Sequence, residues 1–475
     1  MTVRFTNLGE IRQRTSAVLL LVLLLASVDS LCQQPAPVRR LTLSQALELA
    51  QANYPRIRAA MEQQIAARGG ISVARTAYLP RADMLWQTNR ATANNVYGLL
   101  LPQSVIPSIS GPVIPADNSR SAWGSAGGML VSWQPFDFGL RSAQVHAARS
   151  AATAAAAQLN LTRLDVALAT ANAYFDLATA ERLAGVAQSN LDRLQVFAKA
   201  VHVLADNQLR PGADAAQADA GLALARTQLI QARSNAEVYR AALTDLLGSP
   251  NARIEVDETQ LLATPPSEMP APAPLTAHPA AEQEAGLVNE QQARLAVLSR
   301  SYAPQFSTLG AVSGRGTGTA LNGIFPGGSN GLAPDTVNWA AGVQMTFPAL
   351  NIFSVRAEKK VQEANMRAEQ ARYQQTIDDL TAQVLQAEAR LQGAREAAQN
   401  TPVELSAARA SEQQQRARFQ AGLTTVIDVA AAESLLAQAE SDDAVARLNV
   451  WRALAGVAAA RGDLKPFLAQ LPHQP

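Results

Sequence analysis

The chain has 475 residues, of which 5% are aromatic while alanine is abundant, a composition that suits close-packed helices better than a bulky globular core. A formal net charge of +1 and a pI near 7.9 give no electrostatic case for a nucleic-acid partner. The one cysteine, Cys32, excludes an internal disulfide framework.

A targeting segment is predicted over residues 1–32. Three arginines precede an apolar run over 17–28 that is too short to cross a bilayer core of ~30 Å as a helix, as in a secretory signal peptide. Whether Cys32 is lipidated or removed with the signal stays open, although Leu31 does not suit a lipoprotein signal. Beyond Val28 no run of eighteen apolar residues exists, so we expect any entry into a membrane to use strands.

The rest of the chain is an internal duplication. Similar residues recur at two constant spacings, an early offset that leads from Tyr78 to Tyr302 and a late offset that leads from Asp214 to Asp428. The early offset is the longer one, and we place the difference in a loop between Pro80 and Trp133, because loops absorb changes of length that packed elements do not. The repeats are predicted over 33–263 and 275–465, joined by a proline-rich linker over 264–274 and followed by a tail over 466–475. The early offset is defined by Pro55 with Pro279, Tyr78 with Tyr302, and Pro80 with Pro304, and the late offset by Trp133 with Phe347, Asp214 with Asp428, and Gly248 with Gly462.

Each repeat contains the same elements in the same order: a helix, two strands, a long helix, a tip and a returning helix. In repeat 1 these are predicted over 41–77, 82–92, 122–133, 138–207, 210–213 and 214–248. In repeat 2 they are predicted over 279–301, 305–314, 337–347, 354–420, 421–424 and 425–461. At 1.5 Å per residue, each long helix would extend on the order of 100 Å, and two apolar seams on the first of them predict two helical neighbours.

The strand over 337–347 alternates apolar and polar or small residues with a period of two. Taken alone it could belong to a soluble hairpin, but four such strands in a duplicated, exported chain predict a transmembrane β-barrel. The oddly apolar loop segment 99–106 is expected to fold back over the barrel mouth or to contact a neighbour. The residues expected to face lipid are Val337, Trp339, Val343, Met345 and Phe347.

The sequence offers no pattern for catalysis, a cofactor or a metal. Its four histidines are scattered without a second ligand at helical spacing. Gly314, Gly316 and Gly318 lie between predicted strands with no helix to follow, which does not suit a phosphate-binding loop. We therefore expect no enzyme. A rival hypothesis is a periplasmic coiled coil without a pore, in which the apolar side chains of strand 337–347 would be exposed to water.

Several runs resemble the repeats of TolC-type outer membrane efflux proteins. The similar runs are LTLSQALELAQANYP, SWQPFDFG, RPGADAAQADAGLALARTQL and RFQAGLTTVIDVAAAESLLAQAE. This resemblance implies a mainly α fold with membrane β: a homotrimer whose long helical hairpins form a periplasmic tunnel and whose subunits each give four strands to a shared 12-stranded barrel. Four strands with two open edges also require partner strands on physical grounds.

The resemblance also implies the partners. Such proteins lie in outer membrane lipid and dock their helical tips onto a periplasmic adaptor that links them to an inner-membrane pump. By motif position the tip residues are Gly212, Ala213, Gly422, Leu423 and Thr424, although the chemistry of helix hairpins alone would also explain them. The expected function is export of small molecules through a passive conduit; type I protein secretion, which uses the same outer component, is the alternative, and the chain does not identify its cargo.

Asp428 is the candidate pore gate. The resemblance implies a pair of acidic residues after the second tip, but the second position is Ala431, with Glu433 nearby. Asp428 also fits a capping box with Thr425, in which an acid satisfies amides at a helix start. The sequence leaves gating and capping as alternatives.

Overall fold

The computed structural model describes the chain from Arg39 to Leu471 with interruptions. The described residues are 39–92, 103–106, 121–250, 252–257, 261, 265–266, 274–319 and 328–471. The predicted targeting segment, with Cys32, most of the linker, and residues 99–102 of the segment 99–106 lie outside them.

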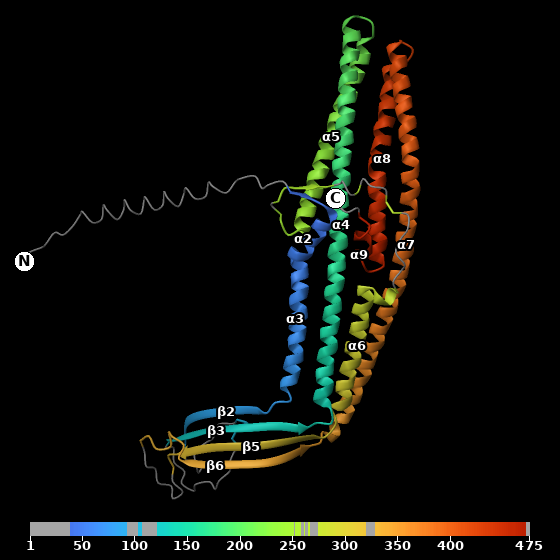
Figure 1. Ribbon diagram of the computed structural model, residues 1–475. Coiled ribbons are helices and arrows are strands. Elements are labelled where there is room, and N and C mark those ends of the chain that lie inside the picture. Colours follow the sequence, from blue (N-terminus) through green and yellow to red (C-terminus); the bar gives the residue numbers. More distant parts are fainter. Residues whose placement is uncertain are drawn as a thin grey trace, which may run out of the picture.

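The molecule is elongated, with helical hairpins along its length and a four-stranded sheet at one end (Figure 1). Its helices are α2 (Leu43–Asn53), α3 (Pro55–Thr76), α4 (Leu140–Asp206), α5 (Gly212–Leu246), α6 (Pro279–Arg300), α7 (Ile352–Gln420), α8 (Val426–Ala460) and α9 (Lys465–Leu468). Its strands are β1 (Arg39–Leu41), β2 (Arg81–Thr92), β3 (Ser121–Phe136), β4 (Ile254–Val256), β5 (Gln305–Thr317) and β6 (Thr336–Thr346). No helix in the described part of the chain is both long and apolar enough to span a membrane.

The duplication is visible in the element bounds. Shifting α5 by the late offset gives the bounds of α8, and shifting α3 by the early offset gives the bounds of α6. The paired glycines Gly248 and Gly462 both follow a helix with positive φ, at 64° and 90°, a conformation that glycine adopts without strain.

Helix α4 is the centre of the molecule. It packs against α3 and α6 in the half nearer the sheet and against α5 and α8 in the half nearer the tips (Figure 1). Buried residues occur on more than one side of it, with Tyr174, Phe175 and Leu177 all fully buried. A helix that is apolar on several sides belongs among other helices, as the two predicted seams indicate.

A compact layer surrounds the middle of α4. Strands β1 and β4 form a parallel pair there, and the Tyr174 hydroxyl lies 3.0 Å from the Leu41 carbonyl oxygen, to which it can donate. The indole of Trp451 on α8 is fully buried and donates to the Leu261 carbonyl at 3.1 Å. This layer holds the two repeats together, because its largest buried cluster takes residues from both.

The helix predicted over 41–77 is wrong as a single element. It is two helices, α2 and α3, separated at Tyr54, whose backbone is extended. Pro55 has no N–H and clashes with a helical residue before it, so the chain turns here and α3 starts with proline at its first position.

The sheet order is β2-β3-β5-β6, all antiparallel, and the helices that adjoin these strands pack in the corresponding order α3, α4, α6, α7. Two strands extend three residues past their predicted ends: β3 continues to Phe136 and β5 to Thr317, because both find partners beyond the alternating pattern. Strand β6 ends at Thr346, so Phe347 follows it. Strands β2 and β6 leave an open edge on either side.

Candidate functional site

The first tip differs from the expected one. Helix α4 ends before Gln208, a non-glycine residue with φ of 60°, and the N–H of Leu209 donates to the Leu204 carbonyl at 2.9 Å. Gly212, predicted as a tip residue ahead of a helix over 214–248, is instead the first residue of α5, and Ala213 follows it on the exposed surface. Pro211 occupies the cap position before α5, where its missing N–H costs nothing.

The second tip is built in the same way around Gly422. Its φ is 74°, and the N–H of Leu423 donates to the Arg418 carbonyl at 2.8 Å, the bond that closes a Schellman motif. The late offset pairs Gln208 with Gly422 and Leu209 with Leu423, and the two leucines are 69% and 70% exposed. Arg210 lies in the tip predicted over 210–213, whereas Gln208 and Leu209 lie just before it, although the same offset pairs them with the second tip.

Arg210 joins the two tips. Its guanidinium lies 4.5 Å from the centre of the Phe419 ring and donates to the carbonyls of Phe419 and Thr424, both at 3.3 Å. The C-terminal carbonyls of a helix attract a cation, and a guanidinium over an aromatic face adds a cation–π contact. Arg210, which lies just before α5, thus connects the first tip to the end of α7.

Asp428 forms the predicted capping box. Its carboxylate accepts from the Thr425 N–H at 2.9 Å and from the Thr424 hydroxyl at 2.7 Å, while its own N–H donates to Thr425 Oγ1 at 3.3 Å. The Thr424 hydroxyl, followed by the Thr425 N–H and hydroxyl, lowers the pKa of Asp428 to about 2. The carboxylate is exposed and ionised at neutral pH, and its capping role is established by these bonds.

Glu433 has a different environment. Its side chain is 1% exposed and pairs with Arg193 of α4 at 3.3 Å and with Arg416 of α7. Arg193 also pairs with Glu440 at 2.9 Å, and Arg416 with Glu412 at 2.8 Å. We call these five residues the tip-proximal ion cluster. Because Glu433 is enclosed by arginines, it does not supply the second exposed acid that the sequence left open near Ala431.

The sheet has one apolar face. Residues directly opposite each other share a face, and one row consists of Met84, Met129, Val312 and Trp339. Val337, Trp339, Val343, Met345 and Phe347 are between 58% and 80% exposed, on the side of β6 and its continuation that carries this row. The predicted lipid-facing residues therefore form one continuous exposed surface with side chains of β2, β3 and β5.

The opposite face of the sheet carries mostly polar and small side chains. It carries, among others, Gln87, Arg315 and Asn338. Val105 and Ile106, from the apolar loop segment, are buried on this face against Ala126. In the described part of that segment, Val105 and Ile106 thus cover this face of the sheet and not the exposed apolar face.

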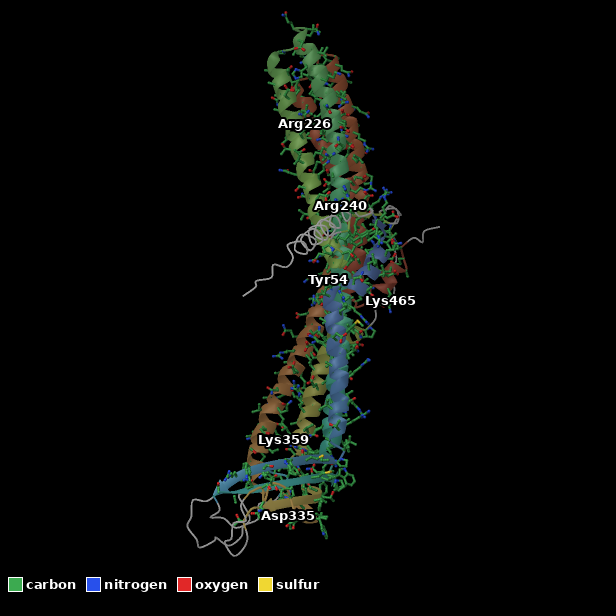
Figure 2. All side chains as sticks on the ribbon, turned by 90° about the vertical axis from the view of Figure 1, so that its left-hand side faces the viewer. Tyr54, Arg226, Arg240, Asp335, Lys359 and Lys465 are labelled. Atoms are coloured by element: carbon green, nitrogen blue, oxygen red, sulfur yellow. The ribbon has the colours of Figure 1, made fainter. Side chains whose placement is uncertain are left out.

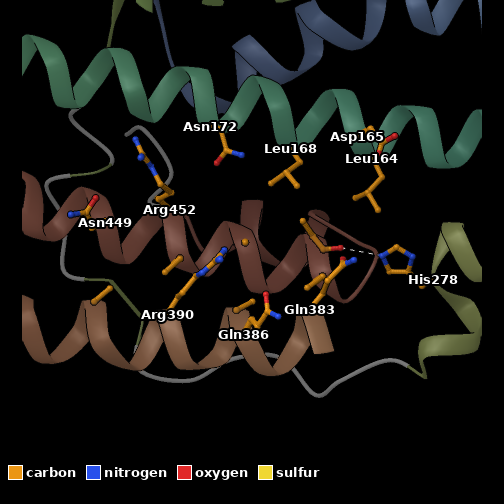
Figure 3. Close-up of a pocket in the computed structure, with 16 residues that line it drawn as sticks. Leu164, Asp165, Leu168, Asn172, His278, Gln383, Gln386, Arg390, Asn449 and Arg452 are labelled. Atoms are coloured by element: carbon orange, nitrogen blue, oxygen red, sulfur yellow. Dashed lines mark hydrogen bonds between the residues drawn. The ribbon is translucent and has the colours of Figure 1, made fainter. Parts of the chain in front are cut away.

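A groove of about 500 Å³ lies between α4, α7 and α8 (Figure 3). His278 lies at one end of it, and both of its ring nitrogens are used: Nδ1 accepts from the Ala280 N–H and Nε2 donates to the Ala459 carbonyl. Burial lowers the pKa of His278, which favours the neutral ring that these two hydrogen bonds hold in place. Among the described residues, no group of three or more His, Cys, Asp or Glu side chains is placed to hold a metal ion.

Comparisons with known proteins agree with this geometry. The family described as outer membrane efflux protein matches residues 46–249 and 280–463, one stretch in each repeat. No match was found among curated proteins.

Solved structures of outer-membrane channels share the fold. The outer-membrane channel OprN is 20% identical with a TM-score of 0.69, covering 88% of this chain and 89% of that chain. The Campylobacter jejuni CmeC channel is 17% identical with a TM-score of 0.73, covering 88% and 85%. The open state of the Neisseria gonorrhoeae MtrE channel is 20% identical with a TM-score of 0.65, covering 89% of each chain. The expected fold class, long helical hairpins with membrane strands, is confirmed, and the chain belongs to the outer membrane efflux protein family.

Proposed function

We propose that this member of the family is the outer membrane component of a tripartite efflux system, a trimeric conduit that carries small molecules to the cell exterior. The observation that carries the proposal is a sheet with one apolar and one polar face that continues directly into helices of 67 and 69 residues. Such helices extend on the order of 100 Å, far beyond the needs of a compact domain. Strands that contact lipid on one side and water on the other suit the wall of a pore.

Three copies would close that wall. Strand β6 of one copy would pair with β2 of the next, which removes the two open edges and gives a shared barrel of twelve strands. The apolar face would then contact lipid and the polar face would line the lumen. The helices would form a tunnel on the periplasmic side, which places the protein in the cell outer membrane with a large periplasmic portion.

The helical tips would dock onto a periplasmic adaptor that connects the conduit to an inner-membrane pump. Support comes from the exposed leucines Leu209 and Leu423, two apolar side chains held out by tight turns. The surrounding contact surface would include Gly212, Ala213, Gly422 and Thr424. Energy for transport would come from the pump, and opening would require the tips to separate.

Asp428 would contribute to the gate as well as to the cap. It is exposed one turn from the second tip and stays charged at neutral pH. Three such carboxylates around a trimer axis would favour cations over anions.

The experiment that tests the docking part changes only the exposed leucines. Substitution at Gly422 would strain a left-handed turn, so we choose Leu209→Asp/Leu423→Asp, with Leu209→Met/Leu423→Met as the matched control. We expect the aspartate variant to lose export in cells while retaining the assembly and bilayer conductance of the purified protein, and the methionine variant to export normally. Normal export by the aspartate variant would remove the tips from the docking proposal.

A further inference from the structure

The junction between the sheet and the helices carries an exposed belt of large apolar side chains. Its members lie near the helix-side ends of the strands, in the connections that follow, or at the start of α7, and each is at least 41% exposed. Trp and Tyr gather at such levels in membrane proteins because an amphipathic ring suits the boundary between hydrocarbon and water. The belt consists of Tyr78, Leu79, Trp133, Phe136, Phe138, Tyr302, Phe347, Leu350 and Phe353.

Positive charge begins directly beyond this belt. The eleven residues of α3, α4, α6 and α7 nearest the sheet are 66–76, 140–150, 290–300 and 352–362, and together they hold nine arginines and lysines against two acidic residues. The next eleven residues along the same helices hold four basic and five acidic residues. In a chain with a net charge of +1, the positive excess is therefore confined to about 16 Å of helix beside the sheet.

Most of these basic side chains are available to a partner. Arg141 is buried and paired with Asp137, and Arg294 is paired with Glu290. Within the described part of the chain, Arg75, Arg356 and Lys360 make no ion pair, and all three are exposed. Figure 2 shows Lys359 on α7 close to the sheet, whereas Arg226 lies toward the tips.

Helix α7 shows the layering most clearly. Phe353, Arg356 and Lys360 follow one another at i, i+3 and i+7, which places them along one side of the helix. Moving away from the sheet, the chain therefore passes from exposed apolar strand residues to an aromatic level and then to cations. Hydrocarbon, interface and anionic head groups are met in that order in one leaflet of a bilayer.

We propose that this basic collar, comprising Arg68, Arg75, Arg149, Arg300, Arg356, Lys359 and Lys360, binds the anionic head groups of phospholipids in the leaflet on the helical side of the membrane. The inference rests on the proposed insertion of the sheet. If β6 of one copy pairs with β2 of the next, α7 and α3 become neighbours, and Arg356 and Lys360 of one copy join Arg75 of the other in one cluster. The collar then selects phospholipids by charge, while the belt and the apolar face contact any lipid.

Quenching of tryptophan fluorescence by brominated lipids tests this selection. The full-length assembly is reconstituted in phosphatidylcholine vesicles that contain a minor fraction of phosphatidylglycerol, with either lipid brominated. We expect the wild type to bind phosphatidylglycerol near its tryptophans at least fivefold more strongly than phosphatidylcholine, and Arg75→Gln/Arg356→Gln/Lys360→Gln to lose this preference. The control Lys199→Gln/Arg226→Gln/Arg409→Gln removes equal charge toward the tips and should retain it.

The failures of the two proposals are distinguishable. Quenching by brominated phosphatidylcholine reports insertion itself, so its absence in the wild type would remove both the inserted sheet and the collar. Normal insertion with equal binding of the two lipids would overturn the collar alone. An unchanged lipid preference in the collar variant, together with altered anion selectivity of its bilayer conductance, would place these cations in the lumen and would also overturn it.

Discussion

At the residue scale, Asp428 combines a cap with an exposed charge. Its pKa is lowered to about 2 by hydrogen bonds that exist only in the folded tip. A carboxylate whose pKa is depressed on folding contributes stability above its ordinary pKa of 3.8, and that contribution is lost as the pH falls through about 2. The tip should consequently remain capped in mildly acidic surroundings.

Protonation of Asp428 also distinguishes a role in the gate from a role in capping alone. If Asp428 lines the pore, block of the current by multivalent cations should persist when the pH is lowered from 7 to 4 and should disappear toward pH 2. Asp428→Asn should abolish the block at all pH values. Thr425→Ala removes a capping hydroxyl but keeps the charge, so it should retain the block. Equal block in wild type and Asp428→Asn would leave the residue only its capping role.

At the element scale, the tip-proximal ion cluster links α4, α7 and α8 through charges that differ in their surroundings. Glu433 sits between two arginines. Burial, together with the nearby Glu433, raises the pKa of Glu412. A carboxyl whose pKa is raised on folding destabilises the protein when charged, and this penalty disappears as the pH falls below its ordinary value.

Two neutral substitutions should therefore have opposite effects. Glu433→Gln leaves two arginines short of a partner and should lower the free energy of unfolding by on the order of 2–3 kcal/mol, less than for a fully buried pair because the arginines are partly exposed. Glu412→Gln should be neutral or stabilising at pH 7. Thermal unfolding of the detergent-solubilised variants measures both, and equal destabilisation by the two substitutions would contradict this reading of the cluster.

The two faces of β6 give a second prediction at this scale. Trp339→Arg places a charge on the exposed apolar face and should reduce assembly in the membrane, at a cost of about 2–4 kcal/mol. Asn338→Arg changes the neighbouring residue on the polar face, so it should assemble normally and alter conductance instead. Heat-modifiable mobility of outer-membrane extracts would report assembly, and similar losses for both variants would argue against a lipid-facing side.

Sequence periodicity predicted helices well where local signals, such as a tight turn and a terminal glycine, set both of their ends. The bounds of α5 and α8 follow from the same offset because each helix begins after a tight tip and ends at a left-handed glycine. The interruption at Tyr54 was also encoded, by Pro55, but the apolar pattern on both sides concealed it. The left-handed turn at Gln208 could not be read locally, since a glutamine carries no signal for positive φ.

Other features that the sequence did not predict depend on contacts between residues far apart in the chain. Nothing around Glu433 indicates burial; its environment depends on Arg193, 240 residues earlier in the chain. The joining of the tips by Arg210 likewise requires Phe419, from the other repeat, to lie beneath its guanidinium. Contacts of this kind arise only after the two repeats pack together.

At the scale of the whole molecule, the duplication gives a chain whose hairpins run along its full length but whose four-stranded sheet has two unpaired edges. Each repeat supplies two strands of the four-stranded sheet and one long hairpin, and α4 with the compact layer around it joins the repeats. The exposed apolar face and the two free strand edges remain unsatisfied in a single copy. Both would be satisfied by lipid and by further copies of the chain.

A membrane conduit shared by three copies fixes the mass of the particle that mild detergent extracts from outer membranes. Native mass spectrometry after release of the detergent should give three times the mass of one mature chain, with no monomer of comparable abundance. A monomeric particle, or one that needs no detergent to stay in solution, would rule out the shared conduit.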